Sequence, residues 1–314
     1  MNKKILVLGS NGLCGSALQE ESVNFPQYDY YFATRKDADL TSQEQVNCLF
    51  KTHKPDIIIN TSAKVGGIGA NLAMAEDFFY DNILINAHVI RAAIENKVEK
   101  LFAFSSVCVF PDNLTLLEED KMHSAEVFDS NFSYGYAKRM IDVHIRAAER
   151  QYGVKNYCSI IPGNIFGKHD MFSIEHGHFI PSILHKIYNA KFNNGPSLEI
   201  WGDGNSLREV IYVNDIARCI LELLDRDIPN KIIISGRREF SIREVVNMIC
   251  DATNYDENEI VWDTSKPNGQ RSRPSSKQVI DSLLPNFQYT DILEGLRKTW
   301  NWMKDNYPNV RTEY

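Results

Sequence analysis

The chain has 314 residues, 43% of them hydrophobic, and a formal net charge of −7. This length and composition are enough for one large domain or two, each with its own core. The acidic balance argues against nucleic acid or an anionic membrane as the main partner. We expect no signal peptide, because the apolar run near the N-terminus, residues 5–8, is too short and no small-residue cleavage site follows it. No apolar run reaches about 18 residues, so no membrane span is expected. The 6 cysteines are scattered without a CxxC pair, which is typical of reduced thiols in a cytoplasmic protein.

The N-terminal segment has the pattern of a dinucleotide-binding unit. Residues 5–8 form an apolar run that predicts a buried strand, and a turn containing Gly9, Asn11, Gly12 and Gly15 leads from it into a helical pattern. Glycines let the backbone approach a pyrophosphate, and a helix N-terminus offers NH groups and a positive dipole. We therefore expect this turn to bind a dinucleotide; an ordinary tight turn is the alternative.

The second predicted strand, residues 29–36, ends in the two bases Arg35 and Lys36. An acidic residue here binds the ribose 2′-OH in NAD-preferring sites, whereas an arginine suits a 2′-phosphate. Arg35 therefore predicts NADP(H), unless both bases are merely solvated surface charges. Asp39 and Leu40 follow where such folds often contact the adenine edge.

The next segments continue the alternation of strands and helices. Residues 55–60 predict a strand, and the small residues after it, Ala63 among them, leave room for a cofactor. A helix is predicted over residues 73–96 and a buried strand over residues 101–104. This alternation predicts an α/β fold with a doubly wound parallel sheet, the Rossmann arrangement.

Two short segments carry candidate catalytic groups. Ser106 and Cys108 follow the strand at 101–104, and ligands bind beyond the carboxyl ends of such strands. Tyr134 and Lys138 lie four residues apart on a helix predicted over residues 133–150, so they share a face. A lysine charge lowers the pKa of a neighbouring phenol, which can then exchange a proton with an alcohol or carbonyl oxygen. Ser106 could hold that oxygen, although Tyr-x-x-x-Lys is also a common helix-face pair.

Beyond about residue 160 the pattern becomes less regular. Strands are predicted near residues 160, 198–202 and 208–213, with Asn214 and Asp215 as a helix cap, and helices over residues 180–190 and 292–306. We expect residues 1–160 to form the NADP(H)-binding domain, to which part of the C-terminal half may return. Residues 161–314 would then form mainly a smaller α/β substrate domain. The histidines at 169, 176 and 178 match no zinc motif, so no metal is expected.

Short motifs follow one another along nearly the whole chain. They are Gly9-x-x-Gly12-x-x-Gly15, Ala63-Lys64-Val65-Gly66-Gly67-Ile68, Ser106-x-Cys108-x-Phe110-Pro111, Tyr134-x-Tyr136-Ala137-Lys138-Arg139, Asn164, His169-Asp170, Gly177-His178-x-x-Pro181, Trp201-Gly202, Arg208-Glu209 and Ser265-Lys266-Pro267-x-Gly269. With these motifs the chain resembles the GDP-L-fucose synthase family of extended short-chain dehydrogenases/reductases. That family reduces, and epimerises at C3 and C5, a GDP-4-keto-6-deoxymannose.

The resemblance implies roles for particular residues. It implies that Tyr134 is the general acid, that Lys138 lowers its pKa and binds the cofactor ribose, and that Ser106 completes the triad. Cys108 and His178 match the acid/base pair of the epimerisation. The residues that would hold the GDP-linked 4-keto sugar are Asn164, Lys186, Trp201, Arg208 and Lys266. The family also implies NADP(H) as cofactor and a homodimer packed through a helix bundle.

Departures from the family pattern keep other activities open. They lie in the loop at residues 123–129 and at Gly163, Lys168 and Met171. The main alternative is a C4-reductase without epimerase activity that acts on another GDP-4-keto sugar, such as a GDP-heptose derivative. A dehydratase would carry an acidic residue just after the triad serine, where this chain has Val107 and Cys108. A sensor or scaffold that binds NADPH without turnover is disfavoured by the intact set of Ser106, Tyr134 and Lys138.

Overall fold

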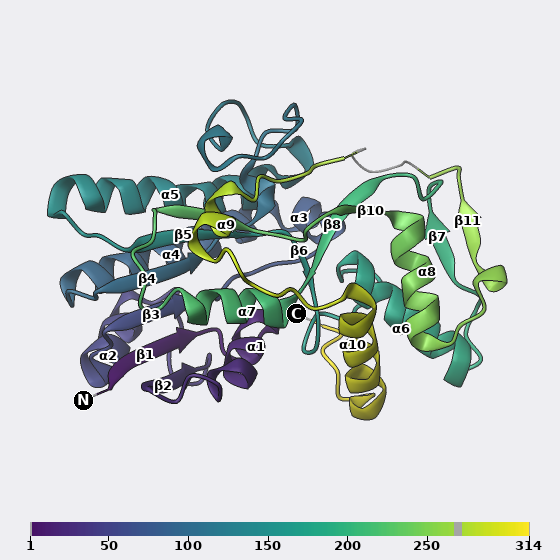
Figure 1. Ribbon diagram of the computed structural model, residues 1–314, viewed down its shortest axis with the longest axis horizontal. Helices are drawn as coiled ribbons and strands as arrows, with labels where there is room; N and C mark the ends of the chain where they lie inside the picture. The colour runs from purple at the N-terminus through teal and green to yellow at the C-terminus, as the bar shows by residue number, and fades with distance from the viewer. Residues whose placement is uncertain (1, 267–271, 314) are drawn as a thin grey trace.

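A six-stranded parallel sheet forms the centre of the computed structural model, which describes residues 2–266 and 272–313 (Figure 1). Its order is β2-β1-β3-β4-β5-β9, and every neighbouring pair is parallel. The strands are β1 (Lys3–Leu8), β2 (Tyr28–Ala33), β3 (Ile57–Asn60), β4 (Lys100–Phe104), β5 (Tyr157–Pro162) and β9 (Lys231–Ile234). The predicted doubly wound parallel sheet is confirmed.

Helices cover both faces of this sheet. They are α1 (Leu13–Ser22) and α7 (Val213–Glu222) on one face, and α2 (Gln43–His53), α4 (Ala75–Glu95) and α5 (Phe132–Tyr152) on the other. Side chains alternate along β1, so Ile5 and Val7 pack with the first group while Leu6 and Leu8 pack with the second. β3, β4 and β5 are buried throughout, which explains why their sequences are apolar without alternation.

The remaining elements form a second body beside the sheet, on the right of Figure 1. It contains a three-stranded sheet in the order β10-β8-β6 and the parallel pair β11-β7. Its elements are β6 (Asn164–Phe166), α6 (Phe179–Phe192), β7 (Glu199–Trp201), β8 (Leu207–Tyr212), β10 (Glu239–Ser241), α8 (Ile242–Thr253), β11 (Val261–Asp263) and α10 (Ile292–Asn306). α6, α8 and α10 share one hydrophobic core with β8.

Shorter helices complete the chain. They are α3 (Ile68–Ala73), α9 (Gln278–Leu283), η1 (Val107–Val109), η2 (Glu119–Lys121), η3 (Asp129–Asn131) and η4 (Glu257–Glu259). Among the helices within residues 2–266 and 272–313, none combines the length and the hydropathy needed to cross a membrane. The division at residue 160 stays a prediction; β9 and α7, from the second half of the chain, pack into the first sheet.

The helix expected over about residues 73–96 is confirmed as α4, and a break at Met74 separates it from α3. Two expectations about element ends are wrong. β2 ends at Ala33, two residues before Arg35, because the Asp37 carboxylate accepts hydrogen bonds from the Thr34 N–H (2.7 Å) and hydroxyl (2.8 Å) and closes a turn.

The second wrong expectation concerns the start of α7. Its N-cap residue is Tyr212, so Asn214 and Asp215 lie within the first turn. The Asp215 carboxylate accepts instead from Thr290, from the backbone N–H at 2.9 Å and from the hydroxyl at 2.6 Å. Asp is a residue type that usually caps helices. Here Thr290, 75 residues away in sequence, binds the Asp215 carboxylate instead.

Lys138 is a charged side chain that the fold buries almost completely, with 1% of its surface exposed. It lies between α5 and β4, where its ammonium donates to the Phe104 carbonyl over 2.8 Å. Burial lowers the pKa of Lys138 from 10.5 to about 7. The unfolded chain therefore binds more protons than the folded chain between these two values. Through Lys138, stability rises with pH across that window.

Replacing Lys138 by methionine removes this pH-dependent penalty. We expect the variant's free energy of unfolding, relative to wild type, to be highest near pH 6 and to fall by on the order of 3 kcal/mol towards pH 9.5. Urea denaturation at several pH values measures the difference. Lys36→Met, which removes an exposed lysine, serves as control. A difference between Lys138→Met and wild type that stays constant with pH would contradict the burial argument.

Candidate active site

The glycine turn lies at the carboxyl end of β1, where the strand order changes direction between β2 and β3. Gly9 has φ +79, and a Cβ added to Gly15 would lie only 2.3 Å from the Gly9 carbonyl oxygen. Side chains at these two positions would therefore strain or block the approach of α1 to the turn. The Ser10 hydroxyl donates to the Ala33 carbonyl (2.8 Å) and fixes the turn to the end of β2. This cradle fits a dinucleotide pyrophosphate on geometric grounds.

The other predicted cofactor residues lie around this turn. Asn11 and Arg35 are exposed, and Ala63 is in the loop after β3. That loop reaches the turn, since the Thr61 hydroxyl donates to the Leu8 carbonyl over 2.8 Å. The Asp39 carboxylate is held within its own turn by the Thr41 N–H (3.0 Å) and hydroxyl (2.7 Å). Leu40 lies beside α4, and its carbonyl is 3.0 Å from Nδ1 of His88.

Ser106, Cys108, Tyr134 and Lys138 gather beyond the carboxyl end of β4. The Ser106 Oγ accepts from the Cys108 N–H over 3.2 Å and begins η1. Tyr134 and Lys138 share a face of α5, as predicted, with Nζ 5.9 Å from the centroid of the phenol ring. The close approach of α5 requires Gly135, because a Cβ there would lie 2.7 Å from the Cys108 carbonyl oxygen.

The electrostatics of the phenol differ from the expectation. Burial raises the pKa of Tyr134 well above its ordinary value, the Cys108 thiol adds to this, and a hydrogen bond with Ser106 only partly opposes it. The expected lowering by Lys138 is therefore not found. The reason is that the ammonium is itself buried, and with a pKa of about 7 it carries only part of its charge at neutral pH. The structure thus keeps the phenol protonated.

Cys108 and His178 come from different parts of the chain. Burial raises the pKa of the Cys108 thiol, while Ser106 and the charge of Arg273 lower it. His178 is the N-cap residue of α6, and 43% of its side chain is exposed. The loop before it meets the loop after β3, because the Gly67 N–H donates to the His176 carbonyl over 3.0 Å.

Two predicted substrate residues contact Glu199 on β7, and a third lies beside one of them. The Lys186 ammonium donates to the Glu199 carbonyl (3.0 Å), and the Trp201 indole N–H donates to the Glu199 carboxylate (3.2 Å). The Trp201 side chain is 62% exposed, and the Lys266 ammonium lies 5.4 Å from its ring centroid. Lys186, Trp201 and Lys266 therefore form one partly exposed patch. Of the motif around Lys266, Pro267 and Gly269 lie outside the described residues.

Asn164 and Arg208 lie on the neighbouring strands β6 and β8. The Asn164 amide donates to the Glu209 carbonyl over 2.8 Å, and Asn164 is otherwise exposed. Burial lowers the pKa of the Arg208 guanidinium, and the charge of Arg273 lowers it further. Arg208 therefore lies near Arg273, which the sequence did not indicate.

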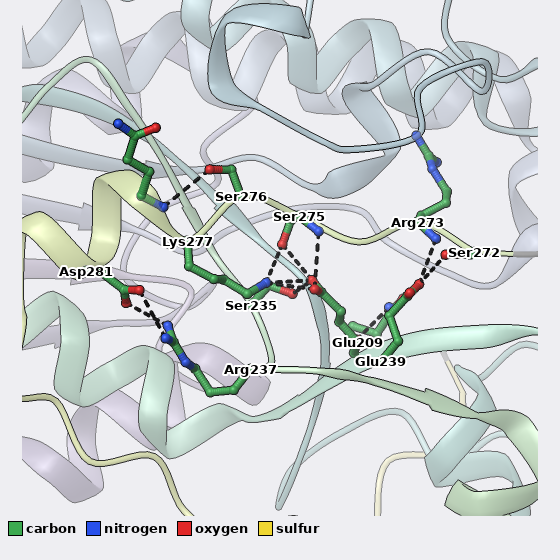
Figure 2. A network of polar contacts seen from close by, with 12 residues as sticks. Glu209, Ser235, Arg237, Glu239, Ser272, Arg273, Ser275, Ser276, Lys277 and Asp281 are labelled. Carbon is green, nitrogen blue, oxygen red and sulfur yellow. Dashed lines mark hydrogen bonds and ion pairs between the residues drawn. The ribbon is translucent and has the colours of Figure 1, made fainter.

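A buried network around Glu209 holds this part of the site together (Figure 2). The Glu209 carboxylate accepts from the hydroxyls of Ser235 (2.7 Å) and Ser275 (2.6 Å) and from the Lys277 ammonium (2.8 Å). It thereby connects β8 with the end of β9 and with residues 272–277. Glu209 belongs to the Arg208-Glu209 motif, but no sequence pattern indicated its partners.

Arg273 extends this network towards the candidate catalytic residues. Its backbone N–H donates to the Glu239 carboxylate over 3.0 Å, and its guanidinium donates to the Pro111 carbonyl over 2.9 Å. Arg273 thus joins the segment held by Glu209 to the loop that carries Cys108. Its only signal in the sequence is a basic residue in a polar segment, which is common on protein surfaces.

The chain is similar in sequence and in structure to known proteins. The NAD dependent epimerase/dehydratase family matches residues 5–235. GDP-L-fucose synthase of Dictyostelium discoideum is 34% identical over 98% of this chain and 98% of its own length. A crystal structure of a GDP-L-fucose synthetase from Naegleria fowleri bound to NADP superposes with a TM-score of 0.90, at 32% identity over 98% of this chain and 95% of that one. A GDP-6-OMe-4-keto-L-xylo-heptose reductase from C. jejuni gives a TM-score of 0.86, at 25% identity over 97% and 98% of the two chains.

These matches cover both the glycine turn and the residues gathered at β4, and they extend over the second body as well. The chain belongs to the NAD dependent epimerase/dehydratase family and, within it, to the GDP-L-fucose synthases.

Proposed function

We propose that this chain uses NADPH to reduce the C4 ketone of a GDP-4-keto-6-deoxymannose-type sugar nucleotide, after epimerising its C3 and C5. The observation that carries the proposal is the meeting of a hydroxyl, a thiol, a phenol and an ammonium at the carboxyl end of β4. Ser106, Cys108, Tyr134 and Lys138 supply these groups.

NADP(H) is the cofactor, and when bound it supplies the hydride. The glycine turn would hold its pyrophosphate at the N-terminus of α1. Arg35, exposed after β2, would pair with the 2′-phosphate, since a guanidinium offers several donors to one phosphate. Asn11, Asp39, Leu40 and Ala63 would border the rest of the cofactor, and Lys138 its ribose.

Tyr134 would act as the acid of the reduction. As negative charge develops on the C4 oxygen, the phenol gives up its proton to that oxygen, and the Ser106 hydroxyl donates a second hydrogen bond. A raised pKa suits this role because it keeps the phenol protonated until the alkoxide forms. Lys138, 5.9 Å from the ring, would then stabilise the phenolate.

Cys108 and His178 would carry out the epimerisation. The C4 ketone acidifies the C–H bonds at C3 and C5, so removal of either proton gives an enolate whose charge lies on the C4 oxygen. Ser106 and Tyr134 are placed to stabilise that oxygen. Thiol and imidazole suit proton transfer on opposite faces of the ring, because their ordinary pKa values lie near neutrality.

The GDP part would bind where the second body offers cations and an exposed aromatic ring. Trp201 provides a surface for the guanine, and Lys186 and Lys266 lie beside it. Arg208 and Asn164, on adjacent strands, would lie nearer the diphosphate and the sugar. This assignment follows the family pattern and the patch around Glu199.

A C4-reductase on another GDP-4-keto sugar is the second candidate. It is favoured by residues 123–129, the loop in which this chain departs from the family pattern. This loop packs on α5 beside Tyr134, since a Cβ on Gly135 would lie 3.4 Å from Val127, and His123 is paired with Asp142 at 2.7 Å. A changed loop at this place could hold the sugar with C3 and C5 out of reach of Cys108 and His178.

We also propose a cytoplasmic homodimer. α4 and α5 pack together and expose Phe79, Tyr80, Val143 and Tyr152 by 41%, 55%, 38% and 48%. The same helix pair of a second copy would cover these side chains in a four-helix bundle. Free cysteines throughout the described ranges support a reducing compartment.

Heavy water distinguishes the two candidate reactions. We expect wild type to place solvent deuterium at C3 and C5 of the product, and Cys108→Ser to lose this label while still reducing C4. NMR of the product reads both positions. Cys48→Ser, which changes an exposed cysteine on α2, should behave as wild type. A wild-type product without deuterium at either carbon would remove the epimerase activity and leave the reductase.

The role of Tyr134 is tested by Tyr134→Phe. Loss of the proton donor should lower turnover by about two to four orders of magnitude, the usual scale for general acid catalysis. Fluorescence titration should show NADPH binding retained, because the cofactor cradle is unchanged. Turnover close to wild type would exclude Tyr134 as the acid.

A further inference from the structure

A buried carboxylate lies behind His178. Asp170 is 3% exposed and belongs to the loop between β6 and α6. Its Oδ1 accepts from the Met171 N–H over 2.8 Å, whereas Oδ2 is buried and has no hydrogen-bond partner within the described parts of the chain. Buried carboxylate oxygens normally have partners, so this oxygen indicates a function beyond closing the loop.

The nearest candidate partner is the imidazole of His178. Its Nδ1 lies 3.7 Å from Oδ1 of Asp170, and it too is buried without a hydrogen-bond partner in residues 2–266 and 272–313. The side chain as a whole is nevertheless 43% exposed. Nδ1 therefore faces inwards to the carboxylate, while other ring atoms face the solvent. A small rotation of either side chain would bring the pair within hydrogen-bond distance.

The charges around His178 come from two segments. Burial lowers the pKa of the imidazole, the ion pair with Asp170 raises it, and Arg311 of the C-terminal segment lowers it; the net shift is upward. Arg311 is fixed nearby, because its carbonyl accepts from the Phe172 N–H over 2.7 Å. Asp170 is therefore the group that raises the pKa of the imidazole against the effects of burial and Arg311.

We propose that Asp170 is a positioning residue that holds the proton of neutral His178 on Nδ1 and directs Nε2 towards the sugar. An ionised carboxylate can only accept hydrogen bonds, so it selects the tautomer with hydrogen on Nδ1. This inference rests on the proposed epimerisation for its purpose, but the pairing itself does not depend on turnover.

This pairing determines which protons move when His178 takes part in the epimerisation. When His178 returns a proton, the Nε2–H bond breaks and a C–H bond forms with the electron pair of the enolate. The imidazolium becomes neutral and keeps its proton on Nδ1, beside Asp170. When His178 removes a proton, the same bonds change in reverse. In both directions the carboxylate stabilises the imidazolium without itself being protonated.

NMR titration of the histidines tests the pairing without any substrate. In ¹⁵N-labelled protein, the His178 signals are those absent from His178→Asn. We expect Asp170→Asn to lower the His178 pKa by about one unit and to remove the preference for Nδ1–H. Asp170→Glu, which restores the carboxylate, should recover at least part of the upward shift.

Asp215→Asn is the matched control. Asp215 is also buried, at 1% exposure, but its partners are Arg218 and Thr290, so this change should leave His178 unaltered. An unchanged His178 pKa and tautomer in Asp170→Asn would overturn the proposal. The same shift in the Asp215 control would also overturn it, since the effect would then be a general one.

Solvent exchange measures the effect on catalysis. Asp170→Asn should slow deuterium uptake by about tenfold or more and move the His178-dependent limb of the pH profile to lower pH, while C4 reduction persists. A wild type without deuterium uptake would refute the proposed epimerisation, yet the titration would still decide the pairing. Normal uptake with an unshifted profile in Asp170→Asn would refute the positioning role.

Discussion

The burial of Lys138 is the constraint on which the site depends. An ammonium with no access to water needs a fixed acceptor, and the Phe104 carbonyl at the end of β4 provides it. This contact sets how α5 lies across the strand ends. Tyr134, one turn away on the same face, is thereby brought over Ser106, and Gly135 allows the helix to approach the Cys108 backbone. Burial also lowers the pKa of Lys138 and raises that of Tyr134. The packing of α5 against β4 therefore fixes both the geometry and the protonation of the pair.

The second half of the chain completes the site through backbone and carboxylate contacts. Glu209 holds residues 272–277 against β8, and Arg273 in that segment reaches the loop of Cys108. The loop after β3 is joined to the loop before His178. The two members of the proposed acid/base pair are therefore held by different connections: Cys108 by β4 and Arg273, His178 by α6 and Asp170. Buried carboxylates recur because each can accept several hydrogen bonds at once.

The sequence predicted the parts of this structure that depend on local pattern. Buried parallel strands are apolar throughout, so β1, β3 and β4 were found, and the glycine turn and the four-residue spacing of Tyr134 and Lys138 needed no tertiary information. The helix cap at Asn214 and Asp215 was wrong because Thr290 captures the carboxylate. The pKa of Tyr134 shifts opposite to expectation because burial cannot be read from spacing. Asp170 and Glu209 belong to motifs that the sequence shows. Their partners are separated from them in the sequence, so only the folded structure identifies these contacts.

The identity of the product's sugar is the most direct test of the proposed activity. The protein would be incubated with GDP-4-keto-6-deoxymannose and NADPH, and the nucleotide sugar identified by NMR. We expect a 6-deoxyhexose that is reduced at C4 and inverted at both C3 and C5, formed with equimolar oxidation of NADPH. A product reduced at C4 with the original configuration at C3 and C5 would contradict the epimerisation, and a mixture in which NADPH is not oxidised would contradict the reduction.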